Sequence, residues 1–178
     1  NPYLYELKTT LLQNGKVIDA STLNTGFRYF TFDPDKGFAL NDTRMKVKGV
    51  CLHHDAGVLG SAVYRDVWKR RLQNLKEIGV NAIRTSHNPQ ASAIYELCDE
   101  LGLLVIDEAY DEWEFPKRKW IEGWNKGTPG FQGSFDYFAE WAEKDLGDQV
   151  KRDRNHLSVF AWSIGNEVDY PNDPYSHP

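Results

Sequence analysis

Acidic, basic and amide side chains follow four short apolar segments of the sequence. The four polar groups are His53-His54-Asp55, Arg84-Thr85-Ser86-His87-Asn88, Asp107-Glu108 and Asn166-Glu167. Histidine and carboxylate side chains are the groups that enzymes use most often for proton transfer, while arginine and asparagine bind the oxygen atoms of polar ligands. Because charges that leave water need partners, we expect these groups to contact one another and a ligand.

Predicted strands precede these polar groups, and helical patterns separate the strands. We expect strands at residues 47–52, 82–84, 103–106 and 158–164. Between them, apolar residues recur at helical spacing over residues 68–78, 94–101 and 138–150. Gly79 and Gly102 end the first two helices, and Ser134 is placed to cap the third. This alternation of strands and helices predicts a parallel sheet.

A parallel sheet either closes into an eight-stranded barrel or stays open as a doubly wound sheet. Gly57 and Gly60 lack the third glycine and the helix entry of a dinucleotide-binding sequence, which weakens the open-sheet alternative. A complete barrel needs ~250 residues, so this chain has room for about the first four strand–helix units. The carboxyl ends of barrel strands open on one face, where active sites lie. We predict an α/β fold with a partial TIM (β/α)8 barrel over residues 43–178.

Residues 1–42 have the pattern of antiparallel strands. Alternating side chains over residues 3–8, 16–20, 27–32 and 37–41 predict four short strands. Asn14-Gly15 predicts a tight hairpin turn, because both central positions of a type I′ turn have positive φ. A closed sandwich usually has about seven strands, so we interpret residues 1–42 as the last strands of a β-sandwich.

Composition narrows the classes of function. The formal net charge is −5, and Lys117-Arg118-Lys119 is a short basic cluster flanked by acids, so a nucleic-acid partner is disfavoured. No apolar run has the ~20 residues that cross a bilayer, so no membrane partner is expected. Cys51 and Cys98 leave a single disulfide or two free thiols open. The chain begins Asn1-Pro2 without Met or a leader, which suggests processing or excision, and it does not indicate a compartment.

Several stretches together resemble glycoside hydrolase family 2, which includes β-galactosidases, β-glucuronidases and β-mannosidases. The stretches are Lys48-Gly49-Val50, Asn81-Ala82-Ile83-Arg84-Thr85-Ser86-His87-Asn88-Pro89, Asp107-Glu108-Ala109, Arg152-Asp153-Arg154-Asn155-His156 and Trp162-Ser163-Ile164-Gly165-Asn166-Glu167. Gly26-Phe27-Arg28 and Gly37-Phe38-Ala39-Leu40-Asn41 resemble the exit of the family's immunoglobulin-like domain into its barrel. The resemblance therefore implies that residues 1–42 are the C-terminal strands of an immunoglobulin-like β-sandwich.

The resemblance implies a retaining hydrolysis of O-glycosidic bonds by two carboxylates roughly 5–5.5 Å apart. Glu167 matches the family's general acid/base, and Asn166 matches the residue that binds the sugar 2-hydroxyl. The nucleophile is expected to be a glutamate further along the chain, and residues 168–178 contain none. We therefore expect this chain alone to be inactive, with the remaining domains of the parent enzyme and a carbohydrate substrate as its partners. A homo-oligomer is left open.

The same resemblance suggests further binding residues. His53, Asp55 and His87 match positions near the bound sugar, and Arg84 is expected to orient a carboxylate through a bidentate pair. Trp113 begins an aromatic loop, with Phe115, Trp120 and Trp124, that should overhang the site and stack on sugar rings or pack against itself. Asp107 and Glu108 either contact the ligand or form a network within the barrel, and Asp153 and Arg154 are expected to form an ion pair or a cap before the fourth strand.

No cofactor is expected to be required. Some β-galactosidases of this family hold Mg²⁺ with a Glu and a His, whereas the matching stretch here reads Asp111-Glu112-Trp113-Glu114 without a histidine. A magnesium site is therefore left open but not indicated, and no Cys/His spacing indicates zinc. Overall likeness favours a β-galactoside as substrate. The alternative is a non-catalytic carbohydrate-binding or interaction module on a degenerate barrel.

Overall fold

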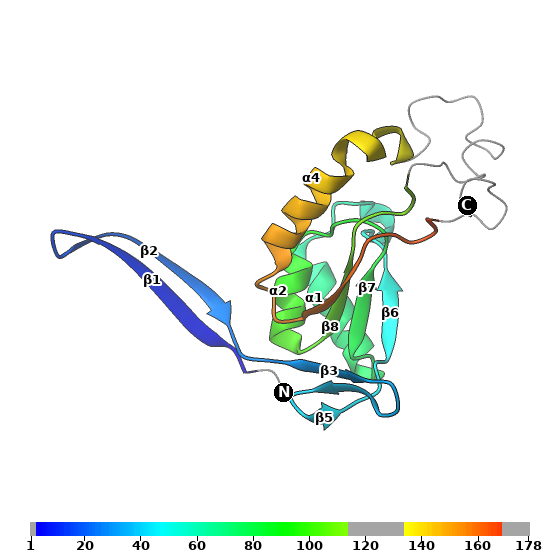
Figure 1. Ribbon diagram of the computed structural model, residues 1–178, viewed down its shortest axis with the longest axis horizontal. Coiled ribbons are helices and arrows are strands. Elements are labelled where there is room, and N and C mark those ends of the chain that lie inside the picture. Colours follow the sequence, from blue (N-terminus) through cyan, green and yellow to red (C-terminus); the bar gives the residue numbers. More distant parts are fainter. Residues whose placement is uncertain (1–2, 114–133, 169–178) are drawn as a thin grey trace.

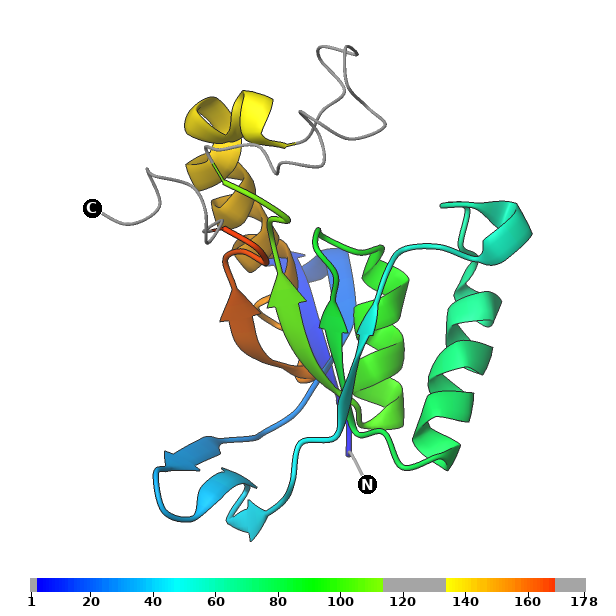
Figure 2. The same ribbon diagram turned by 90° about the vertical axis from the view of Figure 1, so that its right-hand side faces the viewer.

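The computed structural model describes residues 3–113 and 134–168, and its centre is a parallel four-stranded sheet. The strands are β6 (Gly49–Leu52), β7 (Ala82–Thr85), β8 (Leu104–Glu108) and β9 (Val159–Ser163). They lie side by side in chain order, and each pairs with the next in parallel. Their carboxyl ends point to the same edge of the sheet (Figure 2). This is the arrangement of successive strands in a βα barrel, so the predicted partial TIM barrel is confirmed.

Helices connect the strands of this sheet. The helices are α1 (Arg65–Glu77), α2 (Ser92–Leu101) and α4 (Phe135–Asp153), and a short 3-10 turn, η1 (Gly57–Leu59), precedes α1. α1 and α2 lie next to each other against one face of the sheet, and α4 follows on the side of β8 and β9 (Figures 1 and 2). Parallel strands that are neighbours in the sheet need a crossover connection, and here helices supply it.

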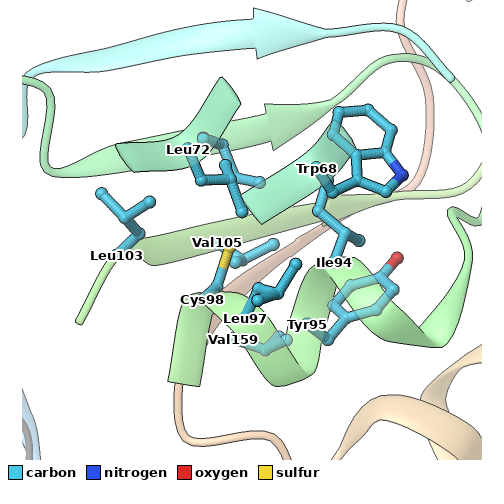
Figure 3. Packing of buried hydrophobic residues seen from close by; sticks show 10 residues of the cluster. Trp68, Leu72, Ile94, Tyr95, Leu97, Cys98, Leu103, Val105 and Val159 are labelled. Atoms are coloured by element: carbon cyan, nitrogen blue, oxygen red, sulfur yellow. The ribbon is translucent and has the colours of Figure 1, made fainter. Parts of the chain in front are cut away.

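The hydrophobic core lies between the sheet and the first two helices (Figure 3). Trp68 and Leu72 come from one turn of α1 to the next, which is the spacing of a single helical face. They meet apolar residues of α2 and of the strands. The other members of the cluster are Ile83, Ile94, Tyr95, Leu97, Cys98, Leu103, Val105 and Val159. Gly102 ends α2 in the left-handed conformation at φ 71°, with its N–H donating to the carbonyl of Cys98.

The N-terminal part is antiparallel and consists of two separate sheets. β1 (Tyr5–Gln13) and β2 (Lys16–Thr25) form a hairpin around Asn14-Gly15, and the hairpin projects away from the barrel strands (Figure 1). Asn14 and Gly15 have φ values of 49° and 78°, as the sequence predicted for this turn. β3 (Phe30–Asp33), β4 (Gly37–Leu40) and β5 (Thr43–Arg44) form the second sheet. That residues 1–42 belong to an immunoglobulin-like sandwich, with a boundary at 42/43, stays a prediction.

The second small sheet is tied to the start of β9. The rings of Phe30 and Phe38 lie 6.0 and 5.4 Å from that of Phe160, measured between ring centroids. The guanidinium of Arg28 donates hydrogen bonds to the carbonyls of Leu157 and Val159. These contacts hold the β3–β5 sheet beneath the amino ends of the barrel strands, at the end opposite to the predicted site.

Three local predictions are wrong. Ser134 stands at the N-cap position of α4 in helical conformation, and its side chain makes no capping hydrogen bond. Ile78 follows the last residue of α1 and is 78% exposed, because the helix ends one residue before the apolar pattern does. Phe27 is exposed and precedes β3, which begins only at Phe30.

Both cysteines are free thiols, Cys51 exposed and Cys98 buried in the core. A search of the described residues finds no helix that is long and apolar enough to cross a membrane.

Candidate active site

Two consecutive carboxylates at the end of β8 point to opposite faces of the sheet, because side chains alternate along a strand. Asp107 accepts a hydrogen bond from the hydroxyl of Tyr95, which belongs to α2 in the helix layer. Glu108 accepts one from Arg84, whose side chain lies on the face that would become the barrel interior. The chemistry at the carboxyl ends of the strands is therefore built around Glu108 rather than Asp107.

Glu108 accepts three side-chain hydrogen bonds although none of its side chain is exposed. Arg84 Nε and Ser163 Oγ donate to its Oε2 atom over 2.6 and 2.7 Å. His87 Nδ1 lies 2.7 Å from its Oε1 atom. The backbone N–H of Glu108 donates to the hydroxyl of Thr85 over 2.8 Å. A buried carboxylate with this many donors is fixed in both position and orientation.

Five polar side chains lie in a ring at this edge of the sheet, which we call the rim ring. Its members are Arg84, His87, Glu108, Asp111 and Asn166. Beyond the bonds of Glu108, Arg84 Nη2 donates to Asn166 Oδ1 over 2.7 Å, and Asn166 Nδ2 donates to Asp111 Oδ1 over 3.1 Å. His87 Nε2 lies 3.9 Å from the same oxygen of Asp111, which is too far for a hydrogen bond, so this side of the ring is a close approach only. The ring joins the ends of β7, β8 and β9.

The charges in the rim ring fix two protonation details. Burial lowers the pKa of Arg84, but its bonds to Glu108 and to Cys51 more than offset this, so the net shift is upward and the guanidinium is charged. The Cys51 contact is 3.6 Å long, from Arg84 Nη1 to the sulfur. His87 faces a carboxylate with Nδ1, so this nitrogen carries a proton, and in the neutral ring Nε2 is then the acceptor.

The segment after β9 is held against the loop after β8. The indole N–H of Trp113 donates to the carbonyl of Ile164 over 2.8 Å, and its ring stacks on Phe138 of α4 at 5.8 Å. A Cβ atom on Gly165 would overlap Cγ1 of Val168 and would lie 2.8 Å from that indole nitrogen, so these close approaches require glycine here. Glu167 is exposed at the same edge, and its backbone N–H donates to the carbonyl of Asp111 over 3.3 Å.

The structure brings most of the predicted site residues to one place. Arg84, His87 and Asn166 are members of the rim ring, and Trp113 and Glu167 border it through the contacts just described. His53 is exposed, and its ring meets that of His87 edge-on at a centroid distance of 5.2 Å.

Asp55 is the exception among the predicted site residues. Its side chain is exposed, and its carboxylate lies 3.7 Å from the guanidinium of Arg71 on α1. This ion pair turns Asp55 toward the helix layer rather than toward the rim ring.

Two predicted pairings are wrong. Arg84 does not bind one carboxylate with both arms, since it divides its donors between Glu108 and Asn166. The predicted ion pair with Arg154 is not formed, because the buried carboxylate of Asp153 accepts two hydrogen bonds, of 2.7 and 2.6 Å, from the guanidinium of the preceding residue, Arg152.

Sequence reasoning missed Ser163 and Cys51 and gave Asp111 no role outside a metal site. The register of the parallel strands would have indicated Ser163 and Cys51. Ser163 lies opposite Glu108 on the adjacent strand, and Cys51 lies opposite Arg84. Asp111 lies in a loop, where no periodicity places a side chain.

Asp107 is the centre of a second, separate polar network in the helix layer. Its Oδ1 atom accepts hydrogen bonds from Tyr95 at 2.7 Å and from Gln149 of α4 at 2.8 Å. Burial raises the pKa of Asp107 to about 6, the bonds from Tyr95 and Gln149 oppose the rise, and the nearby Asp153 carboxylate adds to it. This network lies behind the sheet and shares no side chain with the rim ring.

No group of three or more metal-binding side chains occurs within residues 3–113 and 134–168. Glu114, the last acid of the stretch considered for Mg²⁺, lies outside these residues, as do Phe115, Trp120 and Trp124 of the aromatic loop. That no cofactor is required, with a magnesium site left open, stays a prediction.

Comparison with known protein families identifies the family to which this chain belongs. The sequence model described as "Glycosyl hydrolases family 2, TIM barrel domain" matches residues 34–176. The chain belongs to glycoside hydrolase family 2. This family explains why polar residues from successive strand ends converge at one edge of the sheet.

Relatives with names or solved structures agree with this assignment. The β-galactosidase BoGH2A of Bacteroides ovatus is 48% identical over 94% of this chain, and a putative β-glucuronidase of Formosa agariphila is 42% identical over 94%. A β-glycosidase structure from Bacteroides vulgatus superposes with a TM-score of 0.83 at 44% identity over 96% of the chain. The chain spans only 18%, 15% and 20% of these three proteins, respectively.

Proposed function

We propose that the full-length protein containing this chain is a retaining β-glycoside hydrolase with Glu167 as its general acid/base. The observation that carries the proposal is the position of the Asn166-Glu167 pair directly after β9, with Asn166 bound into the rim ring. Family membership and the names of the relatives support the same reaction class.

In this proposal Glu167 protonates the departing glycosidic oxygen and then removes a proton from the incoming water. A second carboxylate, ~5–5.5 Å away, attacks the anomeric carbon in retaining enzymes. We propose that it comes from a glutamate of a later barrel strand, beyond the 178 residues of this chain. The chain would then contribute half of the catalytic pair and show no turnover alone.

Asn166 is suited to hold the sugar 2-hydroxyl. A primary amide has two N–H donors and two acceptor lone pairs. Arg84 occupies one lone pair and Asp111 one donor, so one of each remains for a ligand, in an orientation that the rim ring fixes. His53 and His87 are proposed to bind further hydroxyl groups, and Trp113 to line the site.

We further propose a β-galactoside as the substrate. The preference is supported by the name of the relative that is 48% identical over 94% of this chain, a β-galactosidase, against 42% identity for the putative β-glucuronidase of Formosa agariphila. Comparing kcat/KM for aryl β-galactosides and β-glucuronides tests this preference, and a larger value for the glucuronide would refute it.

The Glu167→Gln variant of the full-length protein tests the proposed reaction. General acid–base catalysis contributes roughly 10²–10⁴-fold, so we expect a loss of this size on substrates whose leaving group needs a proton. On 2,4-dinitrophenyl glycosides, whose leaving group needs none, the first step should be nearly unchanged. Added azide should then restore turnover and yield a glycosyl azide of retained configuration.

Glu77→Gln is the matched control, because Glu77 is exposed in the last turn of α1, at the opposite end of the sheet. It should leave all rates unchanged. If Glu167→Gln hydrolyses every substrate as the wild type does, Glu167 is not the acid/base. If the wild-type full-length protein binds oligosaccharides without any turnover, the binding-module alternative holds instead.

A further inference from the structure

Glu108 is too deeply buried to touch a substrate, yet it is the most connected member of the rim ring. None of its side chain is exposed, and both its oxygens are occupied by donors from β7, the segment after β7, and β9. Of the residues proposed to meet the sugar, His87 contacts Glu108 directly, and Asn166 is linked to it through Arg84. Its effect on a reaction must therefore be indirect.

We propose that Glu108 is a positioning residue that orients the Asn166 amide through Arg84 and sets the tautomer of His87. The inference rests on the proposed function and deepens it. It assigns to Glu108 the selectivity of the site for a sugar that carries a 2-hydroxyl group.

The Arg84 guanidinium transmits the first effect. Its Nε is held on Glu108 over 2.6 Å, and this fixes the plane from which Nη2 reaches Asn166 Oδ1 over 2.7 Å. With Oδ1 fixed on Arg84 and Nδ2 on Asp111, the amide cannot turn over. Without the Glu108 carboxylate, the Arg84 guanidinium is no longer held in one plane. The Asn166 amide can then turn over, so that its N–H and C=O groups exchange places toward the sugar.

The second effect is on His87. Because Nδ1 donates its proton to the Glu108 carboxylate, Nε2 is left as the acceptor of the neutral ring, on the side of Asp111. A glutamine at position 108 can present an oxygen to only one side. It would direct an amide N–H either at His87 or at the donors of Arg84 and Ser163.

The test compares 2-hydroxy and 2-deoxy aryl β-glycosides in the full-length protein. For Glu108→Gln we expect kcat/KM on the 2-hydroxy substrate to fall about 100-fold, the effect of a misplaced binding group. On the 2-deoxy substrate the fall should be less than about fivefold, because the contact that Glu108 organises is absent there. The ratio of the two kcat/KM values should therefore shrink at least tenfold. The difference in rate between substrates whose leaving group needs a proton and 2,4-dinitrophenyl glycosides should stay as in the wild type.

A second pair of variants covers the case in which Glu108→Gln does not fold. Ser163→Ala removes one of the three donors from Glu108 and should shrink the same ratio about threefold to tenfold, whereas Ser163→Thr keeps the hydroxyl and should restore it. Asp99→Asn is the matched control. Asp99 also accepts a histidine Nδ1 at 2.7 Å, that of His156, and a backbone N–H from Ser158, but it lies on α2 outside the rim ring.

Asp99→Asn should lower stability without changing the ratio. Equal losses of Glu108→Gln or Ser163→Ala on both substrates would overturn the inference, as would a wild type with no preference for the 2-hydroxyl. These results are separate from the proposed function, which fails if Glu167→Gln keeps its full activity.

Discussion

Replacing Asp107 by asparagine should make the protein more stable at neutral pH. The buried cluster around this residue contains two carboxylates, Asp107 and Asp153, both at most 1% exposed, and one guanidinium that both face, that of Arg152. Arg152 already binds Asp153 through two hydrogen bonds. The charge of Asp107 is therefore the one without a balancing cation in this cluster, and an amide at this position removes it while keeping an acceptor oxygen.

The size and the pH window follow from the pKa of Asp107. Burial, together with the charge of Asp153, raises this pKa from 3.8 to about 6 in the folded protein. An acid with a raised folded pKa binds its proton more tightly when folded, so the free energy of unfolding falls as the pH rises from 3.8 to about 6. The full loss above that window is about 3 kcal/mol. Asp107→Asn should recover up to this amount above pH 6 and lose the advantage as the pH falls toward 4.

Hydrogen exchange of the full-length protein measures this effect locally. Peptides from β8 and from the second half of α4 report the opening free energy around Asp107, and comparing wild type with variant at each pH cancels the intrinsic exchange rate. A variant that is less protected than the wild type at pH 7.5, or a difference that does not change between pH 7.5 and 4.5, would refute the reasoning.

Asp99→Asn is the control of opposite sign in the same experiment. Burial lowers the pKa of His156, but the hydrogen bond and charge of Asp99 more than offset this and raise it from 6.5. A histidine with a raised folded pKa stabilises below its unfolded pKa, and the effect is lost as the pH rises through the folded value. The Asp99→Asn variant should therefore lose most stability at acidic pH.

Three further substitutions test the rim ring and the core. Arg84→Lys should lower kcat/KM roughly 10–100-fold, because one ammonium group cannot replace the planar guanidinium that binds two rim-ring partners. Steady-state kinetics measures this, and a variant with the same kcat/KM as the wild type would refute it. Gly165→Ala should lower kcat at least about tenfold, since the added Cβ displaces both Val168 and the indole of Trp113. Unchanged Trp fluorescence and kcat would contradict it. Leu72→Ala should lower the free energy of unfolding by about 2–5 kcal/mol, because this side chain is fully buried in the core. Hydrogen exchange of α1 measures the loss, and a loss below about 1 kcal/mol would contradict the assignment of Leu72 to the core.

The order of strands and helices could be predicted because each element has its own local signal. The apolar stripes of α1 and α2 have helical spacing, and Gly102 has the left-handed conformation that its place after α2 predicts. Since parallel strands in chain order put their carboxyl ends together, the convergence of Arg84, His87 and Asn166 followed from the fold class alone.

The faces of β8 could not be predicted for a physical reason. Leu103-Leu104-Val105-Ile106 is apolar throughout, because a strand covered on both sides has no polar face and so no alternation. The sequence pattern therefore does not indicate on which face of the sheet Asp107 and Glu108 lie. The side on which each lies depends on how α2 and α4 cover the sheet, which is a property of the assembled layers.

The two neighbouring carboxylates allow stability and positioning to be separated by substitutions one residue apart. The Thr85 hydroxyl lies between them, accepting the backbone N–H of Glu108 at 2.8 Å and approaching Asp107 Oδ1 at 3.4 Å. The bond to Glu108 involves only its backbone, so Asp107→Asn leaves every side-chain contact of the rim ring in place. It should therefore raise stability at neutral pH while keeping the ratio of 2-hydroxy to 2-deoxy kcat/KM, whereas Glu108→Gln should change that ratio and leave the pH dependence of stability around Asp107 as it is. If Asp107→Asn alters the ratio as strongly as Glu108→Gln does, β8 transmits the charge state of the helix layer to the rim ring, and the two networks are not independent.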